Sequence, residues 1–127
     1  MNPIFQEVKD SFKDSNGSMV VDFLQLYKMT ELAADLPYST TKISLNYDGP
    51  ALKFTILTHK DTNADFHIDS ASGSCNSLAS PVIIQAKLLR LLLRGFQAFP
   101  QITISLSSKG IEVKSEVFSS LLVADPS

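Results

Sequence analysis

Apolar residues recur at the spacing of an amphipathic helix between Asp22 and Leu36. The pattern stops at Pro37, whose ring cannot continue a helix. The positions that share one side are Phe23, Leu26, Met29, Thr30 and Ala33. The sequence therefore predicts a helix that buries this side and exposes the other to solvent.

A second helical pattern covers residues 87–99 and ends before Pro100. The β-branched run from Val82 to Ile84 comes shortly before it and favours a short strand that leads into the helix. Ser80 and Pro81 would also suit the start of one longer helix, because proline is favoured in the first helical turn. We expect a strand followed by a helix.

After the first helix, apolar and polar residues alternate over residues 43–47 and again over residues 52–56. Asp48, Gly49 and Pro50 lie between the two stretches and are typical of a turn, so this part predicts a β-hairpin. A further strand is predicted from Asp65 to Asp69, where the alternation returns.

The second helical pattern is also followed by a hairpin pattern, over residues 102–106 and 111–113, with a turn at Lys109 and Gly110. Between the two halves of the chain, residues 70–80 are mostly small and polar. Such residues bury little apolar surface, so we expect an exposed connector there.

The two hairpins match each other at a shift of 61 residues, the interval from Ile43 to Ile104. Ile43, Ser44, Leu45, Gly49 and Lys53 then fall on identical residues, namely Ile104, Ser105, Leu106, Gly110 and Lys114. Each hairpin also follows an amphipathic helix, which indicates a duplicated strand-helix-hairpin unit. The sequence therefore predicts an α+β fold built from two such units in tandem.

Composition narrows the class of protein. With 127 residues, 44% of them apolar, the chain can bury one modest core. Its formal net charge of −2 excludes a protein that coats nucleic acid by charge alone, so any DNA contact must come from a local basic patch. Cys75 is the only cysteine, which favours the reducing cytosol or nucleus. The first residues do not resemble an export signal, so we expect a soluble protein that is not exported.

Three cations share one narrow arc of the second predicted helix: Lys87, Arg90 and Arg94. The opposite side is apolar and consists of Leu88, Leu89, Leu92, Leu93, Phe96 and Phe99. Because the arc contains no acid, a helix packed by its leucines would present these cations to successive phosphates without reading bases. The competing interpretation is an ordinary solvated face, where Lys and Arg are common. In the first helix, Lys28 is a further candidate, although Glu31 and Asp35 share its polar side.

The chain lacks the residue groups that catalysis requires. Its carboxylates are scattered, without the close grouping that a metal-dependent nuclease needs. His67 with Asp69, and His59 with Asp61, repeat a two-residue spacing, but no third metal ligand is evident. No activated nucleophile, phosphate-binding loop or dinucleotide motif is present. We therefore expect no enzyme activity, no catalytic residue, no metal site and no cofactor.

Four segments, in this order, resemble the middle of the Rad-one family subunit of the heterotrimeric checkpoint sliding clamp, of the nine-one-one type: residues 4–9, 20–24, 47–54 and 101–105. The likeness spans roughly residues 4–118 and depends on order and spacing. It implies a DNA-clamp-like fold, in which helices cover one face of antiparallel sheets and line the hole of a ring.

The resemblance also implies a domain organisation. Residues 1–69 would be the second half of a first clamp-like domain, residues 70–80 an interdomain connector, and residues 81–127 the truncated first half of a second clamp-like domain. The chain would then be a fragment of a longer subunit. The residues themselves leave open whether the two units pack on each other instead.

The resemblance further implies a nuclear DNA-damage checkpoint role. The partners would be two other checkpoint-clamp subunits in a heterotrimer, a clamp loader, DNA bound without sequence preference, and recruited repair and signalling factors. Subunits of such rings join by pairing edge strands, and the strand at that position is Asp65, Phe66, His67, Ile68 and Asp69, with an opposite edge near residues 121–125. The alternative function is a small α+β protein-interaction module with no DNA role, and a nuclease is a more distant one.

Overall fold

The structure, a computed structural model, describes residues 6, 10, 17–36, 41–57, 64–71 and 75–124. From residue 17 onward, the described part of the first unit runs from a strand through a helix to a hairpin and a further strand. The elements are β1 (Ser18–Asp22), α2 (Phe23–Ala34), β2 (Lys42–Asp48), β3 (Ala51–Leu57) and β4 (Ala64–Asp69). These elements confirm the first predicted helix, the first hairpin and the strand that follows it.

The second unit repeats this order. It consists of β5 (Val82–Gln85), α3 (Ala86–Leu93), the short 3₁₀ helix η1 (Arg94–Phe96), β6 (Gln101–Ser107), β7 (Gly110–Lys114) and β8 (Ser119–Val123). The expected strand followed by a helix is therefore confirmed. The α-helix ends six residues earlier than predicted, where Gly95, a poor helix former, follows in the 3₁₀ turn.

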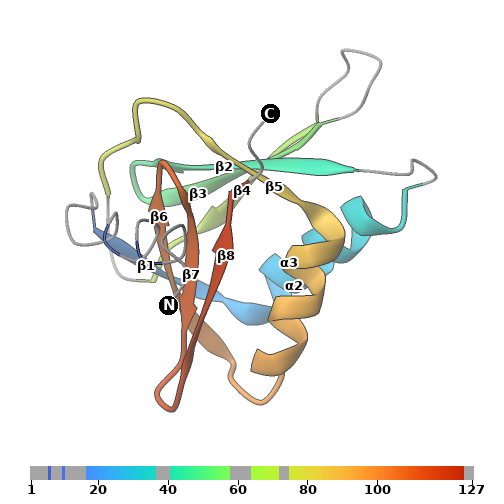
Figure 1. The fold of residues 1–127 in the computed structure, drawn as a ribbon, viewed down its shortest axis with the longest axis vertical. Helices are drawn as coiled ribbons and strands as arrows, with labels where there is room; N and C mark the ends of the chain where they lie inside the picture. Colours follow the sequence, from blue (N-terminus) through green and yellow to red (C-terminus); the bar gives the residue numbers. More distant parts are fainter. Residues whose placement is uncertain are drawn as a thin grey trace.

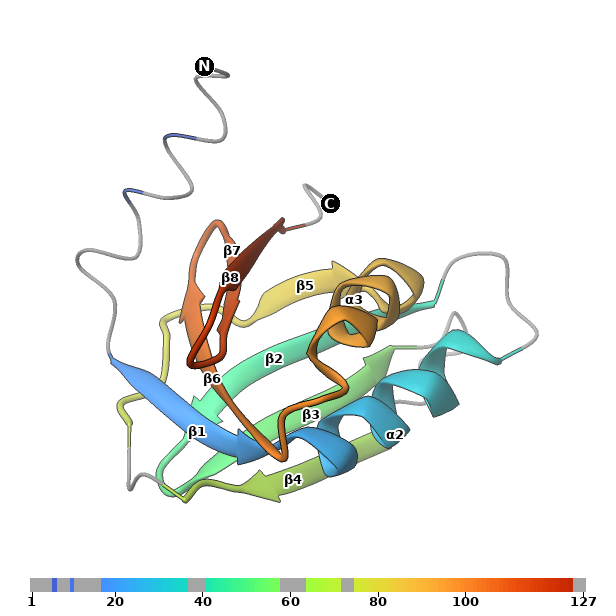
Figure 2. The same ribbon diagram turned by 90° about the horizontal axis from the view of Figure 1, so that it is seen from below.

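The strands form two antiparallel sheets with four strands each, in the orders β1-β6-β7-β8 and β4-β3-β2-β5. The helices α2 and α3 lie side by side and cover the two sheets from one side (Figures 1 and 2). This arrangement is the predicted α+β fold, with tandem units and helices on one face of antiparallel sheets.

The first strand of each unit joins the sheet of the other unit. β1 pairs with β6, and β5 pairs with β2, so each sheet contains three strands of one unit and one strand of the other. The chain then enters each helix through an equivalent hydrogen bond: the N–H of Phe23 donates to the carbonyl of Pro100, and the N–H of Ala86 donates to that of Thr41. The exchanged strands interlock the two units.

This exchange differs from the expected division into two half-domains at 1–69 and 81–127. The described parts of both segments contribute strands to both sheets and side chains to one core. Without the other unit, each sheet would lose an edge strand. The two units therefore pack on each other, which is the alternative that the sequence left open. The place of these segments in a longer clamp subunit stays a prediction.

The described residues of the expected connector, 70, 71 and 75–80, are exposed or partly exposed, and several of them are hydrogen-bonded to the first hairpin. The N–H of Ser70 donates to Pro50, the N–H of Cys75 donates to Gly49, and the N–H of Leu78 donates to the side chain of Asn46 at 2.8 Å. These bonds attach the described part of the segment to the turn end of the β2–β3 hairpin. One polar side chain of the segment adds a further bond to β2, since the hydroxyl of Ser77 donates to the carbonyl of Tyr47 at 2.7 Å.

The internal repeat is confirmed, but the structural correspondence differs from the predicted one by two residues. β2 and β6 have equal length and lead into turns of equal length, so Lys42 corresponds to Gln101 and Ala51 to Gly110, an interval of 59 residues. Side chains alternate along a strand with a period of two, so a slip of two residues leaves each one on the same face. The hydrophobic pattern could not distinguish the two intervals.

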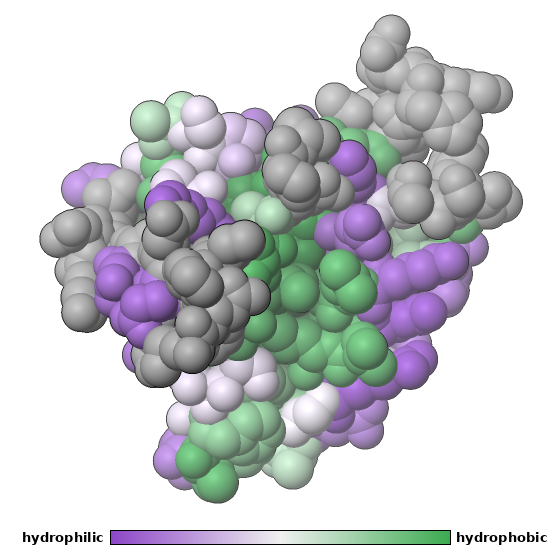
Figure 3. Space-filling view, in the orientation of Figure 1, coloured by the Kyte–Doolittle hydropathy of each residue, from purple (hydrophilic) through white to green (hydrophobic). Residues whose placement is uncertain are grey.

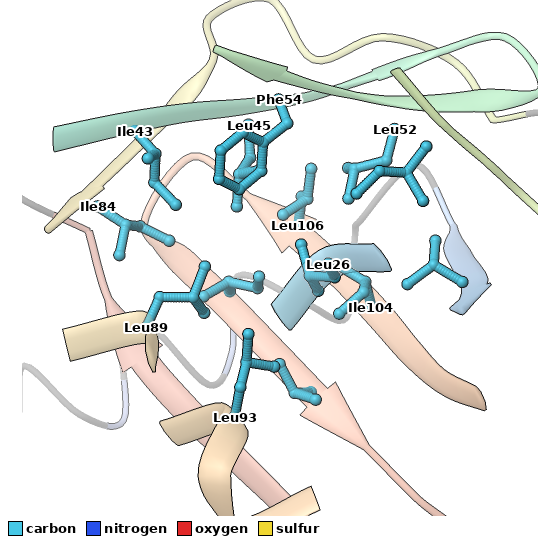
Figure 4. Packing of buried hydrophobic residues seen from close by; sticks show 14 of the residues in the cluster. Leu26, Ile43, Leu45, Leu52, Phe54, Ile84, Leu89, Leu93, Ile104 and Leu106 are labelled. Atoms are coloured by element: carbon cyan, nitrogen blue, oxygen red, sulfur yellow. The ribbon is translucent and has the colours of Figure 1, made fainter. Parts of the chain in front are cut away.

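The core lies between the two sheets and beneath the helices. Side chains from β2, β3, β5 and β6 point toward those of α2 and α3 in one continuous cluster (Figure 4). Fully buried residues of this cluster include Leu26, Leu89 and Leu93 of the helices and Leu45 and Ile104 of the sheets. No helix in the described part of the chain is long and apolar enough to span a membrane.

Candidate nucleic-acid interface

The three predicted cations lie on α3 and the turn after it, and two of them, Arg90 and Arg94, contact residues of α2 or its C-terminal end. Lys87 and Arg94 are exposed, whereas Arg90 is partly buried. The helix is held in place by Ala86, Leu89 and Leu93, which pack into the core. The shared arc that the sequence predicted is therefore present in the structure.

Arg90 is not a free cation. One of its guanidinium nitrogens, Nη1, lies 2.7 Å from Oδ1 of Asp35, at the C-terminal end of α2. The Arg90 side chain is 21% exposed and that of Asp35 is 69% exposed. Because the pair is partly in contact with water, it stabilises the fold only modestly. The larger effect of the pair is that Asp35 neutralises the positive charge of Arg90, which a contact with a DNA phosphate would require.

Arg94 also contacts α2. Its Nε donates a hydrogen bond to the hydroxyl of Tyr27 at 3.4 Å. This bond, the charge interaction with the Tyr27 hydroxyl and the carboxylates of Glu31 and Asp35 raise the pKa of Arg94, so the guanidinium stays charged. Arg94 remains exposed and accessible to a phosphate.

Two features of this face were not predicted. The arc was expected to be free of acid, but the neighbouring helix places Asp35 and Glu31 beside the cations. The leucines were expected to be buried, but Leu88 is 45% exposed. Both differences arise because a helical wheel describes one helix alone, while the charge and burial of a face depend on the helix that packs beside it.

Leu91 was overlooked. It is 64% exposed and lies on the side of α3 opposite its core residues. The helical spacing already places Leu91 beside the charged arc rather than on the apolar side, since it is four residues after Lys87 and three before Arg94. An exposed leucine therefore borders the basic arc of this helix. Lys28 is exposed on α2.

The predicted interface strand, β4, lies at the edge of its sheet, next to β3 alone. Asp65, His67 and Asp69 are exposed, Phe66 is partly buried and Ile68 is fully buried. The strand is therefore anchored by its apolar residues, while its outer backbone side has no neighbouring strand among the described residues. Its contact with another subunit stays a prediction.

Polar bonds fix the exposed side of β4. The ring nitrogen Nε2 of His67 lies 2.9 Å from Oδ2 of Asp48, and the hydroxyl of Thr55 donates to Oδ1 of Asp65 at 2.8 Å. His67 thus has a single carboxylate beside it, and within the described ranges no three His, Cys, Asp or Glu residues gather as a metal site would require. His59 and Asp61 lie outside the described residues.

The fold resembles that of bacterial DNA polymerase sliding clamps. The Caulobacter crescentus clamp superposes with a TM-score of 0.75 at 14% identity, over 100% of this chain and 34% of that chain. The beta subunit of Streptococcus pyogenes DNA polymerase gives 0.73 at 12% identity, over 90% of this chain and 32% of that one. A putative DNA polymerase III beta subunit from Eubacterium rectale gives 0.70 at 15% identity, over 99% and 34%.

These similarities establish a sliding-clamp fold. They show the fold alone, because superposition at such low identity reports only on the path of the backbone. The chain spans about a third of the length of the solved structures it resembles. No protein-family model matches the sequence, and no curated protein matches it significantly.

Proposed function

We propose that this chain is one clamp-like domain of a ring that encircles DNA without sequence preference. The observation that carries the proposal is the sliding-clamp fold with cations exposed on its helix layer. Helices that carry Lys and Arg on an open face can contact the phosphate backbone of any sequence, because phosphates carry no base information.

Within that role, the resemblance to the Rad-one family favours a subunit, or a fragment of one, of the DNA-damage checkpoint clamp. Its partners would be two other clamp subunits and a clamp loader, and its location the nucleus. The bacterial neighbours support the clamp fold and do not distinguish a checkpoint clamp from a replicative one. The proposed role is binding and recruitment, without catalysis.

A salt titration of duplex binding by the full chain tests the DNA contact. The change is the triple variant Lys87→Ala, Arg90→Ala and Arg94→Ala, and the readout is fluorescence anisotropy of a labelled duplex. Each lost phosphate contact reduces the slope of log K against log salt by about one, so the triple variant should reduce it by about three at most. Because Arg90 is paired with Asp35, a reduction of about two is expected.

The matched control is Lys114→Ala, on β7 and paired with Glu112 at 3.2 Å. This substitution removes a positive charge away from the helix layer, so it should leave the slope unchanged. A slope that is equal in the wild type and the triple variant would contradict the DNA contact. It would favour the alternative, a protein-interaction module, which the exposed Leu91 and the Arg90–Asp35 pair also support.

Assembly through β4 is a separate part of the proposal. Edge strands of clamp-like domains can join by main-chain hydrogen bonds, and Asp65 and Asp69 make this edge acidic. Reversal of both charges, with Asp65→Lys and Asp69→Lys, should prevent co-purification with a partner clamp subunit while circular dichroism stays unchanged. Co-purification that survives the double reversal would remove β4 from the interface.

A further inference from the structure

The exposed apolar side chains of the molecule form two groups. Among the described residues, one group lies at or next to the sheet edge where the clamp resemblance places another subunit, and consists of Val117, Phe118 and Val123. The other group lies on the two helices and consists of Leu24, Leu32, Leu88 and Leu91. Figure 3 shows apolar residues gathered over the region of α3 and β8, bordered by polar residues on the α2 side. The subunit edge accounts for the first group but not for the second.

The helices α2 and α3 run antiparallel and share one outward surface. Along α3 the residue numbers rise from Arg90 to Arg94, while those of their hydrogen-bond partners fall from Asp35 to Tyr27. These two bonds hold the helices side by side (Figures 1 and 2). We call the solvent-exposed side of the pair the outer helix face.

Each helix exposes a stripe on this face that combines leucine with a cation. The stripe of α2 has a spacing of four residues and consists of Leu24, Lys28 and Leu32. The stripe of α3 and the turn after it has spacings of four and three residues and consists of Lys87, Leu91 and Arg94. All six residues are exposed, so two antiparallel rows present the same mixture of apolar and positive side chains.

The charges of this face restrict what can cover it. Among the ion pairs of the described residues, none involves Lys28 or Lys87, and Asp35 is already paired with Arg90. A second copy laid on this face would bring Lys and Arg close to Lys and Arg, which is unfavourable. DNA phosphates would pair with the cations but leave the leucines in water. The ligand that fits both side-chain types is therefore anionic and apolar.

We propose that the outer helix face also binds an amphipathic helix of a partner protein, with apolar side chains on one side and Asp or Glu beside them. Helices pack by placing rows of side chains, three or four residues apart, between the rows of their neighbours, and both stripes have that spacing. The apolar side of the partner covers Leu32 and Leu91, and its carboxylates reach Lys28 and Lys87. Docking does not depend on DNA binding. Its effect on DNA rests on the proposed function, because partner and duplex use the same cations and exclude each other.

A designed peptide tests the docking on the full chain. The probe is a labelled peptide of about fifteen residues, long enough to form a helix, with leucines along one side and glutamates elsewhere. Fluorescence anisotropy should show saturable binding. One control peptide has the same composition with its leucines spread around the helix, and the other has lysine in place of glutamate; each should bind at least about tenfold more weakly. No saturation up to about 1 mM, or equal binding of either control, would overturn the proposal.

Leucine substitutions locate the docking site. Leu32 and Leu91 are 53% and 64% exposed, so the double variant Leu32→Gln with Leu91→Gln should fold, as circular dichroism would verify. It should bind the acidic peptide about tenfold more weakly, because two apolar side chains no longer leave water on binding. The matched control is Val117→Gln, which removes an exposed apolar side chain next to β8 and should bind like the wild type. Full binding by the double variant, or loss in the control alone, would contradict the site.

A charge exchange gives a second, independent readout. Lys28 is exposed, so Lys28→Glu should fold. It should weaken binding of the acidic peptide and strengthen binding of the lysine peptide, because a carboxylate then stands where the partner's carboxylates approach. An unchanged preference between the two peptides would show that charge does not select the partner and would overturn the proposal.

Duplex binding separates this inference from the proposed function. The acidic peptide should displace a labelled duplex from the wild type, and the double leucine variant should keep duplex binding while it loses the peptide. A chain that binds duplex but not peptide would overturn the docking and leave the DNA contact in place. A chain that binds peptide but not duplex would support the docking and contradict the DNA contact. Binding of both at once would contradict a shared face.

Discussion

The hydroxyl of Tyr47 holds the two sheets together at Leu106. Its oxygen accepts the backbone N–H of Leu106 at 2.8 Å, and its proton is donated to the carbonyl of Gly17 at 2.7 Å. Tyr47 belongs to β2 in one sheet and Leu106 to β6 in the other, so one side chain fixes the distance between them. The residue is 1% exposed, and both bonds are needed because a buried hydroxyl without partners is costly.

Removal of this hydroxyl should destabilise the protein. Tyr47→Phe leaves the N–H of Leu106 buried without its acceptor, which should lower the free energy of unfolding by about 1–3 kcal/mol. Urea denaturation followed by circular dichroism measures the change. Tyr27→Phe is the matched control: it removes a partly exposed hydroxyl that accepts a 3.4 Å bond from Arg94, and it should have a smaller effect. Equal losses in the two variants would contradict the bridging role.

The same hydroxyl should make the protein sensitive to alkali. Burial raises the pKa of Tyr47 from 10.0 to about 12, against the opposing effect of the Leu106 N–H bond and with a smaller contribution from Cys75. Between these two pH values the unfolded chain releases the proton while the folded chain keeps it, so the free energy of unfolding falls as pH rises. The slope should not exceed about 1.4 kcal/mol per pH unit for one group. Denaturation at several pH values should show this fall in the wild type and a flatter profile in Tyr47→Phe.

Two leucines of α2 should differ sharply in their contribution to stability. Leu26 is fully buried in the core, whereas Leu24, two residues earlier, is 52% exposed. Leu26→Ala leaves a cavity and should cost about 2–5 kcal/mol, while Leu24→Ala should cost well below that. Thermal or urea unfolding distinguishes them. A large loss in Leu24→Ala would indicate that another chain covers this position in solution.

The N-termini of the two helices offer an engineering test of the repeat. Asp22 caps α2, its Oδ2 accepting the N–H of Gln25 at 3.1 Å, but Gln85 at the corresponding position of α3 makes no capping bond. Gln85→Asp should therefore stabilise the protein by about 0.5–1 kcal/mol, and Asp22→Ala should destabilise it by about 0.5–2 kcal/mol. Both are measured by equilibrium unfolding. A loss of stability in Gln85→Asp would mean that the two N-termini are not equivalent.

Asp35 should limit DNA binding by occupying Arg90. Asp35→Asn removes the carboxylate charge at 2.7 Å from the guanidinium and leaves Arg90 free to contact a phosphate. We expect tighter duplex binding at low salt and a steeper salt dependence, by up to about one unit of slope. Anisotropy titrations measure both quantities. The effect should vanish in the double variant with Arg90→Ala, which serves as the control.

Much of the local structure could be predicted because it depends on neighbours in sequence. The helical spacing from Phe23 to Ala33 and the turn at Gly49 led to the observed α2 and first hairpin. Gly49 has a φ of 61°, a conformation that glycine adopts readily, so its place in a two-residue turn follows from residue type alone. The arc of Lys87, Arg90 and Arg94 is likewise a property of one helix.

The apolar surface beside β8 depends on contacts that the sequence does not display. Phe118 stacks on Phe96 with ring centroids 4.6 Å apart, which draws the end of the β7–β8 connection against the turn after α3. Nothing in the periodicity around Val117 indicates whether another element covers it, and in the structure it is 77% exposed. An edge is defined by the absence of a neighbour, and that absence is a tertiary property.

By itself, the sequence determined the two helices, the two hairpins and the strands β4 and β5, together with their order and duplication, because these follow from side-chain periodicity over a few residues. Only the tertiary structure decided that β1 and β5 exchange sheets, that the repeat interval is 59 residues, and that Asp35 neutralises Arg90. Each of these depends on which distant segments meet. A strand bonds equally well to several partners, and a helix face gains or loses net charge according to the helix packed beside it.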